Sequence, residues 1–158
     1  MSFLRFLMLL SLIVWLGGVI FFASVLAPTV FRFLPTHQLA GNVVSRSLNI
    51  LHWIAIISGV TFLVSSMIVS RFTTGEAHPF AFRHVLLYLM LMLTLISQFG
   101  ISPKMAELRM SMGDIDLISP ADPMRVRFNA LHVWSTRLES GVLLLGLVAV
   151  YSMARSIP

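Results

Sequence analysis

The chain has 158 residues, of which 58% are hydrophobic and 11% are charged, and its mean hydropathy is +0.93. Soluble domains are about 45–50% apolar and about 25% charged, so this composition excludes an ordinary soluble domain and indicates a membrane protein. The net charge of +5 comes from residues that flank apolar runs, as contact with anionic lipid headgroups requires; no basic–aromatic surface suggests nucleic-acid binding. Because cysteine is absent, disulfides, thiolate nucleophiles, iron–sulfur clusters and covalently attached haem are excluded.

Four segments are apolar for about the 20 residues that a helix needs to cross a bilayer. We therefore predict an all-α fold, an integral membrane bundle of four antiparallel transmembrane helices that forms a single domain over residues 1–158. The predicted helices cover residues 3–34, 39–71, 80–112 and 122–155. The first segment could also be a signal peptide, but its apolar run is longer than the usual 7–15 residues or so, which favours a membrane helix.

Small residues and prolines give further detail along these helices. Gly17 and Gly18 in the first helix and the Ala55–Gly59 pair in the second predict close approach of neighbouring helices. Pro28 is expected to bend the first helix and Pro35 to end it. Asp122 precedes a proline and is expected to be the N-cap of the fourth helix.

Helix parity places the N-terminus, the second connection and the C-terminus on one side, and the first and third connections on the other. The first side has four arginines and the second has six basic residues: Arg32, Arg46, Lys104, Arg109, Arg125 and Arg127. Cytoplasmic loops carry more Lys and Arg, so we expect both of these connections in the cytoplasm, and a bacterial inner (plasma) membrane as the location.

The pattern Asn-x-Leu-His occurs twice, at Asn49–His52 and again eighty residues later at His132. Each copy lies where its helix enters the membrane from the same side. At 3.6 residues per turn, His132, Ser135 and Glu139 share one stripe of the fourth helix. Ionisable residues inside membranes usually face the bundle interior in pairs. We therefore predict a polar cluster between helices two, three and four, formed by His52, His132, Glu139, Asn49, Gln98 and Ser135.

Three functions fit this cluster. The first is a non-enzymatic membrane protein whose cluster binds a small ligand or ion. The second is a membrane redox protein that holds haem b or a metal through His52 and His132. The third is a structural accessory subunit of a membrane complex, in which the polar residues only hold helices together and Glu139 pairs with Arg32, Arg46 or Arg137. The expected partners are the lipid bilayer and a second copy or another membrane subunit.

No Gly-rich phosphate loop, Ser–His–Asp spacing or His-Glu-x-x-His motif occurs, which favours a protein without enzymatic activity. His37, His78 and His84 lie in or beside the predicted connections and carry little functional signal.

Several local sequences resemble a known family. They are Trp15-Leu-Gly-Gly, Phe21-Phe22, Ala27-Pro-Thr, Arg127-Phe-Asn-Ala-Leu-His132 with Ser135, and Gly141-Val-Leu-Leu-Leu-Gly. They are similar to the transmembrane-protein-205-like family, whose bacterial members are filed as domain of unknown function 4149. The resemblance spans nearly the whole chain. It implies a four-helix integral membrane protein and no assigned activity.

Overall fold

The computed structural model describes residues 2–75 and 81–155. Its elements are α1 (Ser2–Phe21), η1 (Phe22–Leu26), α2 (Ala27–Phe33), α3 (His37–Thr74), α4 (Phe82–Leu95), η2 (Ile96–Ile101), α5 (Ser102–Met112), η3 (Ile115–Leu117) and α6 (Pro123–Ala154). Here η1 and η2 are π-helical segments and η3 is a 3₁₀ turn. Within the described ranges all regular structure is helical, which confirms the predicted fold class.

The elements join into four long helical stretches that are apolar enough to cross a membrane. They are Ser2–Phe33, His37–Thr73, Phe82–Met112 and Pro123–Ala154. Their bounds lie close to the predicted ones, although the predicted start of the third helix at residue 80, like His78, lies outside the described residues.

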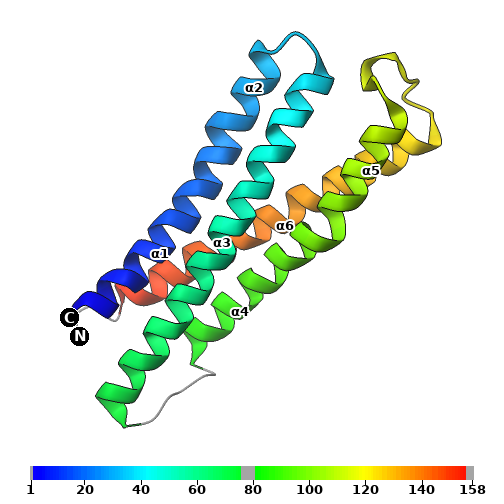
Figure 1. The fold of residues 1–158 in the computed structure, drawn as a ribbon. Helices are drawn as coiled ribbons and strands as arrows, with labels where there is room; N and C mark the ends of the chain where they lie inside the picture. Colours follow the sequence, from blue (N-terminus) through cyan, green and yellow to red (C-terminus); the bar gives the residue numbers. More distant parts are fainter. Residues whose placement is uncertain (1, 76–80, 156–158) are drawn as a thin grey trace.

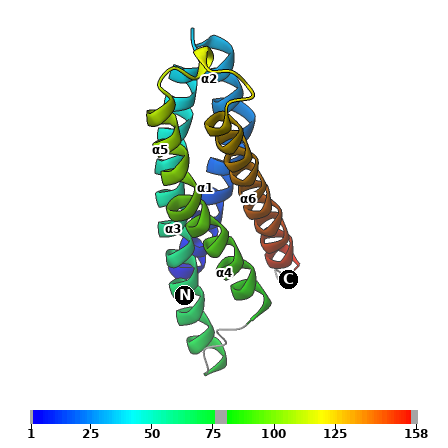
Figure 2. The ribbon, with the colours of Figure 1, turned by 90° about the vertical axis from the view of Figure 1, so that its right-hand side faces the viewer.

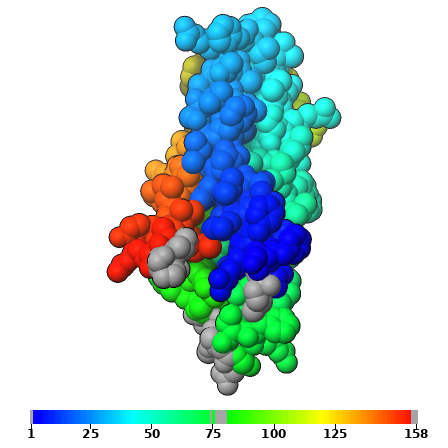
Figure 3. Space-filling model, turned by 90° about the vertical axis from the view of Figure 1, so that its left-hand side faces the viewer, coloured from blue at the N-terminus to red at the C-terminus, as the bar shows by residue number. Residues whose placement is uncertain are grey.

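Successive stretches run antiparallel (Figures 1 and 2). Both ends of the chain lie at one end of the bundle, and the α2–α3 and α5–α6 connections lie at the other (Figure 1). Figure 3 shows α1 and α2 side by side with α3 along one face, and the C-terminal part of α6 next to α1. The arrangement agrees with the helix parity expected from the sequence.

The core lies where α1, α3, α4 and α6 meet. Trp15, Phe62, Leu87, Met90 and Val142 are at most 1% exposed there. The outer faces of the four stretches carry many exposed large apolar side chains, as expected for surfaces that contact lipid rather than water.

Glycine allows two close helix contacts. A Cβ on Gly59 of α3 would lie 2.6 Å from Leu91 Cδ2 and 2.8 Å from Trp15 Cζ3, so only glycine fits without a shift. Gly18 is equally constrained, with Leu51 Cδ1 2.6 Å from the position of its absent Cβ. The close approach predicted at Gly18 and Gly59 is confirmed, whereas the one predicted at Gly17 is wrong, because a Cβ there would enter open space.

The two π-helical segments each end two residues before a proline. Pro28 follows η1 and Pro103 follows η2. Proline has no N–H to donate to the carbonyl four residues earlier, and its ring crowds that carbonyl. In both cases that carbonyl belongs to the π-helical segment, at Ser24 and Phe99. The wider π-helical turn accommodates the carbonyl that the proline leaves without a hydrogen bond, so each helix continues past its proline.

The helix ends follow the local sequence. Thr36 caps α3 by accepting a hydrogen bond from the Leu39 N–H, and Asp122 caps α6 by accepting one from the Met124 N–H. The predicted N-cap at Asp122 is confirmed. Leu34, the residue before Pro35, is extended and ends α2, as the residue before a proline favours.

Candidate functional site

His52 is the centre of a polar cluster between α3, η2 and α6. Its side chain is 1% exposed. Its Nδ1 lies 2.8 Å from Gln98 Oε1, and its Nε2 lies 2.6 Å from Glu139 Oε1. The histidine therefore connects three of the four helical stretches through side-chain hydrogen bonds inside a span that is otherwise apolar.

Each of the three residues has a position that the local sequence explains. His52 lies on the buried side of α3 with Leu51 and Ala55. Gln98 lies in η2, where the π-helical turn changes the angle at which successive side chains leave the helix. Glu139 lies one turn after the buried Ser135 on α6.

The hydrogen-bond inventory limits the protonation states of the cluster. An ionised Glu139 only accepts, so His52 Nε2 must carry a proton to donate to it. If Gln98 presents its oxygen, Nδ1 must carry a proton too, and the ring is an imidazolium paired with a carboxylate. If the Gln98 amide turns over, its NH₂ group donates to an unprotonated Nδ1 and the ring is neutral. With Glu139 ionised, the cluster thus has two hydrogen-bonded arrangements that differ by one proton; a protonated Glu139 would instead donate to Nε2, with Nδ1 donating to the Gln98 oxygen.

Glu139 keeps acceptor capacity beyond this contact. Its side chain is 16% exposed, and within the described residues only His52 contacts it by a hydrogen bond or ion pair. Its second carboxylate oxygen can therefore accept a hydrogen bond or contact a cation. The partner of Glu139 is a histidine, and not Arg32, Arg46 or Arg137 as one interpretation of the sequence had it.

The other three predicted site residues separate into one buried and two exposed side chains. Ser135 is 6% exposed, whereas Asn49 and His132 are exposed. The buried line of α6 contains Phe128, Ser135 and Val142. At about 100° per residue, His132 lies about 40° from Phe128 and about 60° from Ser135.

Glu139 lies on the same flank of α6 but about 10 Å further along the axis, at 1.5 Å per residue, where it contacts α3. The structure therefore brings together His52, Gln98 and Glu139. It does not place His132 or Asn49 with them. The two Asn-x-Leu-His copies differ in environment, since one histidine is buried and the other exposed.

The predicted haem or metal site depends on free histidine nitrogens. Both ring nitrogens of His52 have hydrogen-bond partners, so ligation of iron would require one of these contacts to break. His132 lies on the exposed side of α6. Within the described residues, no group of three or more His, Asp or Glu side chains could hold a metal ion. The residues as arranged do not fit a two-histidine haem site.

A second buried histidine was not assigned to a site from the sequence. His84 of α4 and Ser66 of α3 are fully buried, and His84 Nε2 lies 2.7 Å from Ser66 Oγ. The available signal was the run of serines at 65, 66 and 70, which share one side of α3 and are buried. His84 lies in the first turn of α4, and its nearness to the second connection gave no sign in the sequence that it is buried.

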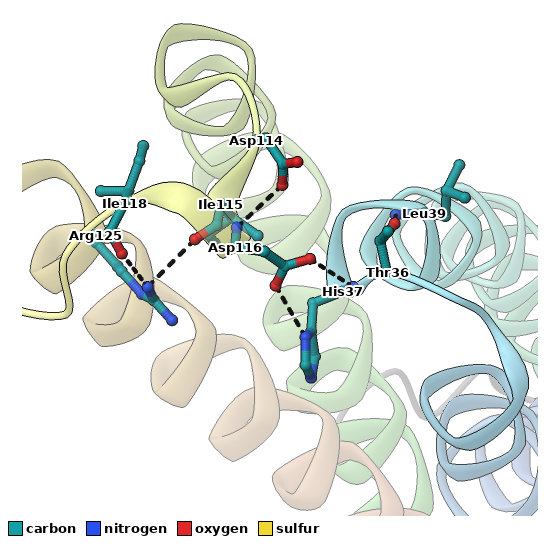
Figure 4. A network of polar contacts seen from close by, with 8 residues as sticks. All are labelled: Thr36, His37, Leu39, Asp114, Ile115, Asp116, Ile118 and Arg125. Atoms are coloured by element: carbon teal, nitrogen blue, oxygen red, sulfur yellow. Dashed lines mark hydrogen bonds and ion pairs between the residues drawn. The ribbon is translucent and has the colours of Figure 1, made fainter.

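His37 also has a role that the sequence did not reveal. Asp116 of η3 accepts hydrogen bonds from both the His37 backbone N–H and the His37 ring, at 3.0 and 2.9 Å (Figure 4). Arg125 of α6 contacts the carbonyls of Ile115 and Ile118 on either side of Asp116 (Figure 4). The two connections at this end of the bundle are therefore joined to each other.

Four spanning helices with an ionisable cluster between them define an integral membrane protein. The chain belongs to the family described as Domain of unknown function (DUF4149), which matches residues 10–114. This confirms the resemblance to that family; the link to transmembrane-protein-205-like proteins stays a prediction. No curated protein and no solved structure matches the chain. The family match includes His52 and Gln98 and ends before Glu139.

Proposed function

We propose that this membrane protein binds a small ligand or ion at the Gln98–His52–Glu139 cluster, and that the ligand carries positive charge or a hydrogen-bond donor. The observation that supports this proposal is the 2.6 Å contact between a fully buried histidine and a glutamate whose second oxygen has no partner within the described residues. A carboxylate in this position attracts positive charge.

The energetics favour a functional interpretation. A buried ion pair is weak evidence for stability, because desolvation of both charges offsets most of their attraction. Apolar residues of similar size would hold three helices together at less cost. Retaining an ionisable pair in an apolar span makes sense if the pair holds a ligand.

Binding of small cations to the purified protein tests the proposal. The thermal unfolding of the protein in detergent would be measured with sodium, potassium, ammonium and magnesium chlorides at equal ionic strength. We expect one of the ions to raise the Tm of the wild type. Glu139→Gln should abolish this rise, and Glu107→Gln, which changes an exposed glutamate of α5, should leave it intact.

If none of the four ions gives a rise that depends on Glu139, the cation form of the proposal is wrong. If a parallel set of neutral amides and alcohols also gives no rise in Tm that depends on Glu139, the hydrogen-bond-donor form of the proposal is wrong as well. The accessory-subunit interpretation would then be preferred, with the cluster acting only between helices.

We further propose that the protein lies in the bacterial plasma membrane with the α2–α3 and α5–α6 connections in the cytoplasm. The six basic residues on that side support this orientation. The chain has no cysteine, so single cysteines can report it. In intact cells, a membrane-impermeant maleimide should label Ser2→Cys and not Ser119→Cys; the reverse result would invert the orientation.

The exposed apolar faces support contact with the lipid bilayer, and a second copy or another membrane subunit could cover part of them. Cross-linking in native membranes followed by size analysis would distinguish the two. A band at twice the chain mass indicates a homodimer, whereas a band of another mass indicates a complex with a different subunit.

A further inference from the structure

A groove with both polar and apolar lining lies between the first three turns of α3 and the last two turns of α5, away from the His52 cluster. It has a volume of about 560 Å³ and is lined by Gln38, Asn42, Ser45, Arg46 and Arg109, together with small and apolar side chains. No carboxylate lines it. Glu107 lies on the same helix α5 but is exposed and outside the groove lining.

Arg109 is held in place at the base of this groove. Its Nη1 donates a 2.9 Å hydrogen bond to the Gly41 carbonyl, and its guanidinium lies 5.3 Å from the centre of the Phe128 ring. A Cβ on Gly41 would lie 3.2 Å from Nη2 of the same guanidinium. The glycine therefore leaves room for the arginine to lie against the α3 backbone, and the contacts leave other guanidinium N–H groups available.

The other polar residues that line the groove are also hydrogen-bond donors. Arg46 is exposed on α3 and carries a second guanidinium into the groove. Gln38 lines the groove and adds an amide NH₂ group as a neutral donor. Asn42 and Ser45 supply further donors. Two arginines and three neutral donors without an acid form a site for an oxyanion.

The position of the groove identifies the source of the oxyanion. Arg46 lies just before the apolar part of α3, and Arg109 lies near the outer end of a helical stretch that crosses the membrane. Residues at the ends of spanning helices are expected at the level of the lipid headgroups, where basic pockets between helices bind anionic phospholipids. We propose that this groove binds the phosphate of an anionic phospholipid headgroup, with Arg109 and Arg46 as its principal contacts.

The test compares lipids, with inorganic phosphate as the second source of the same chemistry. The Tm of the purified protein in a neutral detergent would be measured with short-chain phosphatidylglycerol, short-chain phosphatidylcholine or inorganic phosphate. At a phosphatidylglycerol concentration about 100 times the Kd, the wild-type Tm should rise by roughly 5–10 °C. Phosphatidylcholine and phosphate should give much smaller rises.

Two arginine variants separate the groove from general surface charge. Arg46→Gln removes one guanidinium of the groove, and Arg127→Gln removes an exposed arginine that does not line it. The apparent Kd for phosphatidylglycerol should rise about tenfold or more in Arg46→Gln and stay unchanged in Arg127→Gln. Neither substitution touches a buried contact, so both proteins should fold.

Each other result contradicts the proposal in a different way. An equal rise of the phosphatidylglycerol Kd in Arg46→Gln and Arg127→Gln would assign lipid binding to net charge alone. An equal rise with phosphatidylcholine would mean that detergent exchange, not the headgroup, stabilises the fold. If inorganic phosphate raises the Tm as much as phosphatidylglycerol does, the groove is a phosphate site, but its ligand is free phosphate and not a lipid headgroup.

Discussion

Replacement of the His52–Glu139 pair by leucine, singly and together, measures what the cluster contributes to stability. His52→Leu leaves the Glu139 carboxylate without its partner, and Glu139→Leu leaves the imidazole Nε2 without an acceptor. Each single change should destabilise the protein, because a polar group is left unpaired in an apolar span. The double change removes both groups and should cost less than the sum of the two single changes.

The size of the coupling follows from the kind of contact. Hydrogen bonds between membrane helices contribute about 0.6 kcal/mol on average and at most about 1.7 kcal/mol. A charge-assisted hydrogen bond is roughly twice as strong as a neutral one. At 2.6 Å, with the histidine 1% exposed, the His52–Glu139 contact belongs to the stronger class. We expect a coupling free energy of about 1–3 kcal/mol.

The assay is unfolding by dodecyl sulfate in mixed micelles, followed by the fluorescence of the three tryptophans. A matched cycle combines His52→Leu with Glu107→Leu, since Glu107 is exposed on α5. That control should be additive within about 0.5 kcal/mol. If the His52–Glu139 cycle is also additive, the two side chains do not interact, and both the hydrogen bond and the ligand site built on it are wrong.

Two further predictions concern packing and cofactor binding. Gly59→Val should lower the free energy of unfolding by about 1–3 kcal/mol in the same assay, because the new side chain would meet Leu91. Gly17→Ala is the control, since its added Cβ enters open space and should be tolerated. Equal effects of the two substitutions on the free energy of unfolding would refute the packing argument. The purified protein should show no Soret band when oxidised or reduced with dithionite, because both His52 ring nitrogens already have partners; a band that disappears in His52→Ala would overturn this assignment.

The fold could be predicted from the sequence because bilayer thickness and helix geometry set strong limits. Twenty or so apolar residues predict one spanning helix, and short connections predict antiparallel neighbours. Capping at Asp122 and the helix end before Pro35 depend only on local chemistry. The π-helical segments before Pro28 and Pro103 were not predicted, because a proline only limits which adjustments a helix can make.

The candidate site was predicted in part. His52, Gln98 and Glu139 were all named from the sequence, since each is a polar side chain in an apolar helix. His132 was placed with them because it shares a flank of α6 with Glu139. Helical periodicity predicts the direction in which a side chain leaves its helix. It does not predict which neighbouring helix lies opposite that residue along the membrane normal. His84 was missed for the opposite reason, since its position near a connection did not reveal that α3 covers it.

Ser97 separates a binding site from a purely structural one. It precedes Gln98 in η2, is completely buried, and its hydroxyl has no hydrogen-bond partner among the described residues. A buried unpaired hydroxyl lowers stability, so Ser97→Ala should leave the free energy of unfolding unchanged or raise it by up to about 1 kcal/mol in the absence of ligand.

If the hydroxyl completes the ligand site beside Gln98, the same variant should weaken the ion-dependent rise in Tm that depends on Glu139. Thr94→Val provides a control on the same face of the third stretch, because the Thr94 hydroxyl already donates to the Met90 carbonyl. A Ser97→Ala protein that is less stable without ligand would show that the hydroxyl has a partner in the folded protein. An unchanged response to the ion would remove Ser97 from the site, and the cluster would then consist of His52, Gln98 and Glu139 alone.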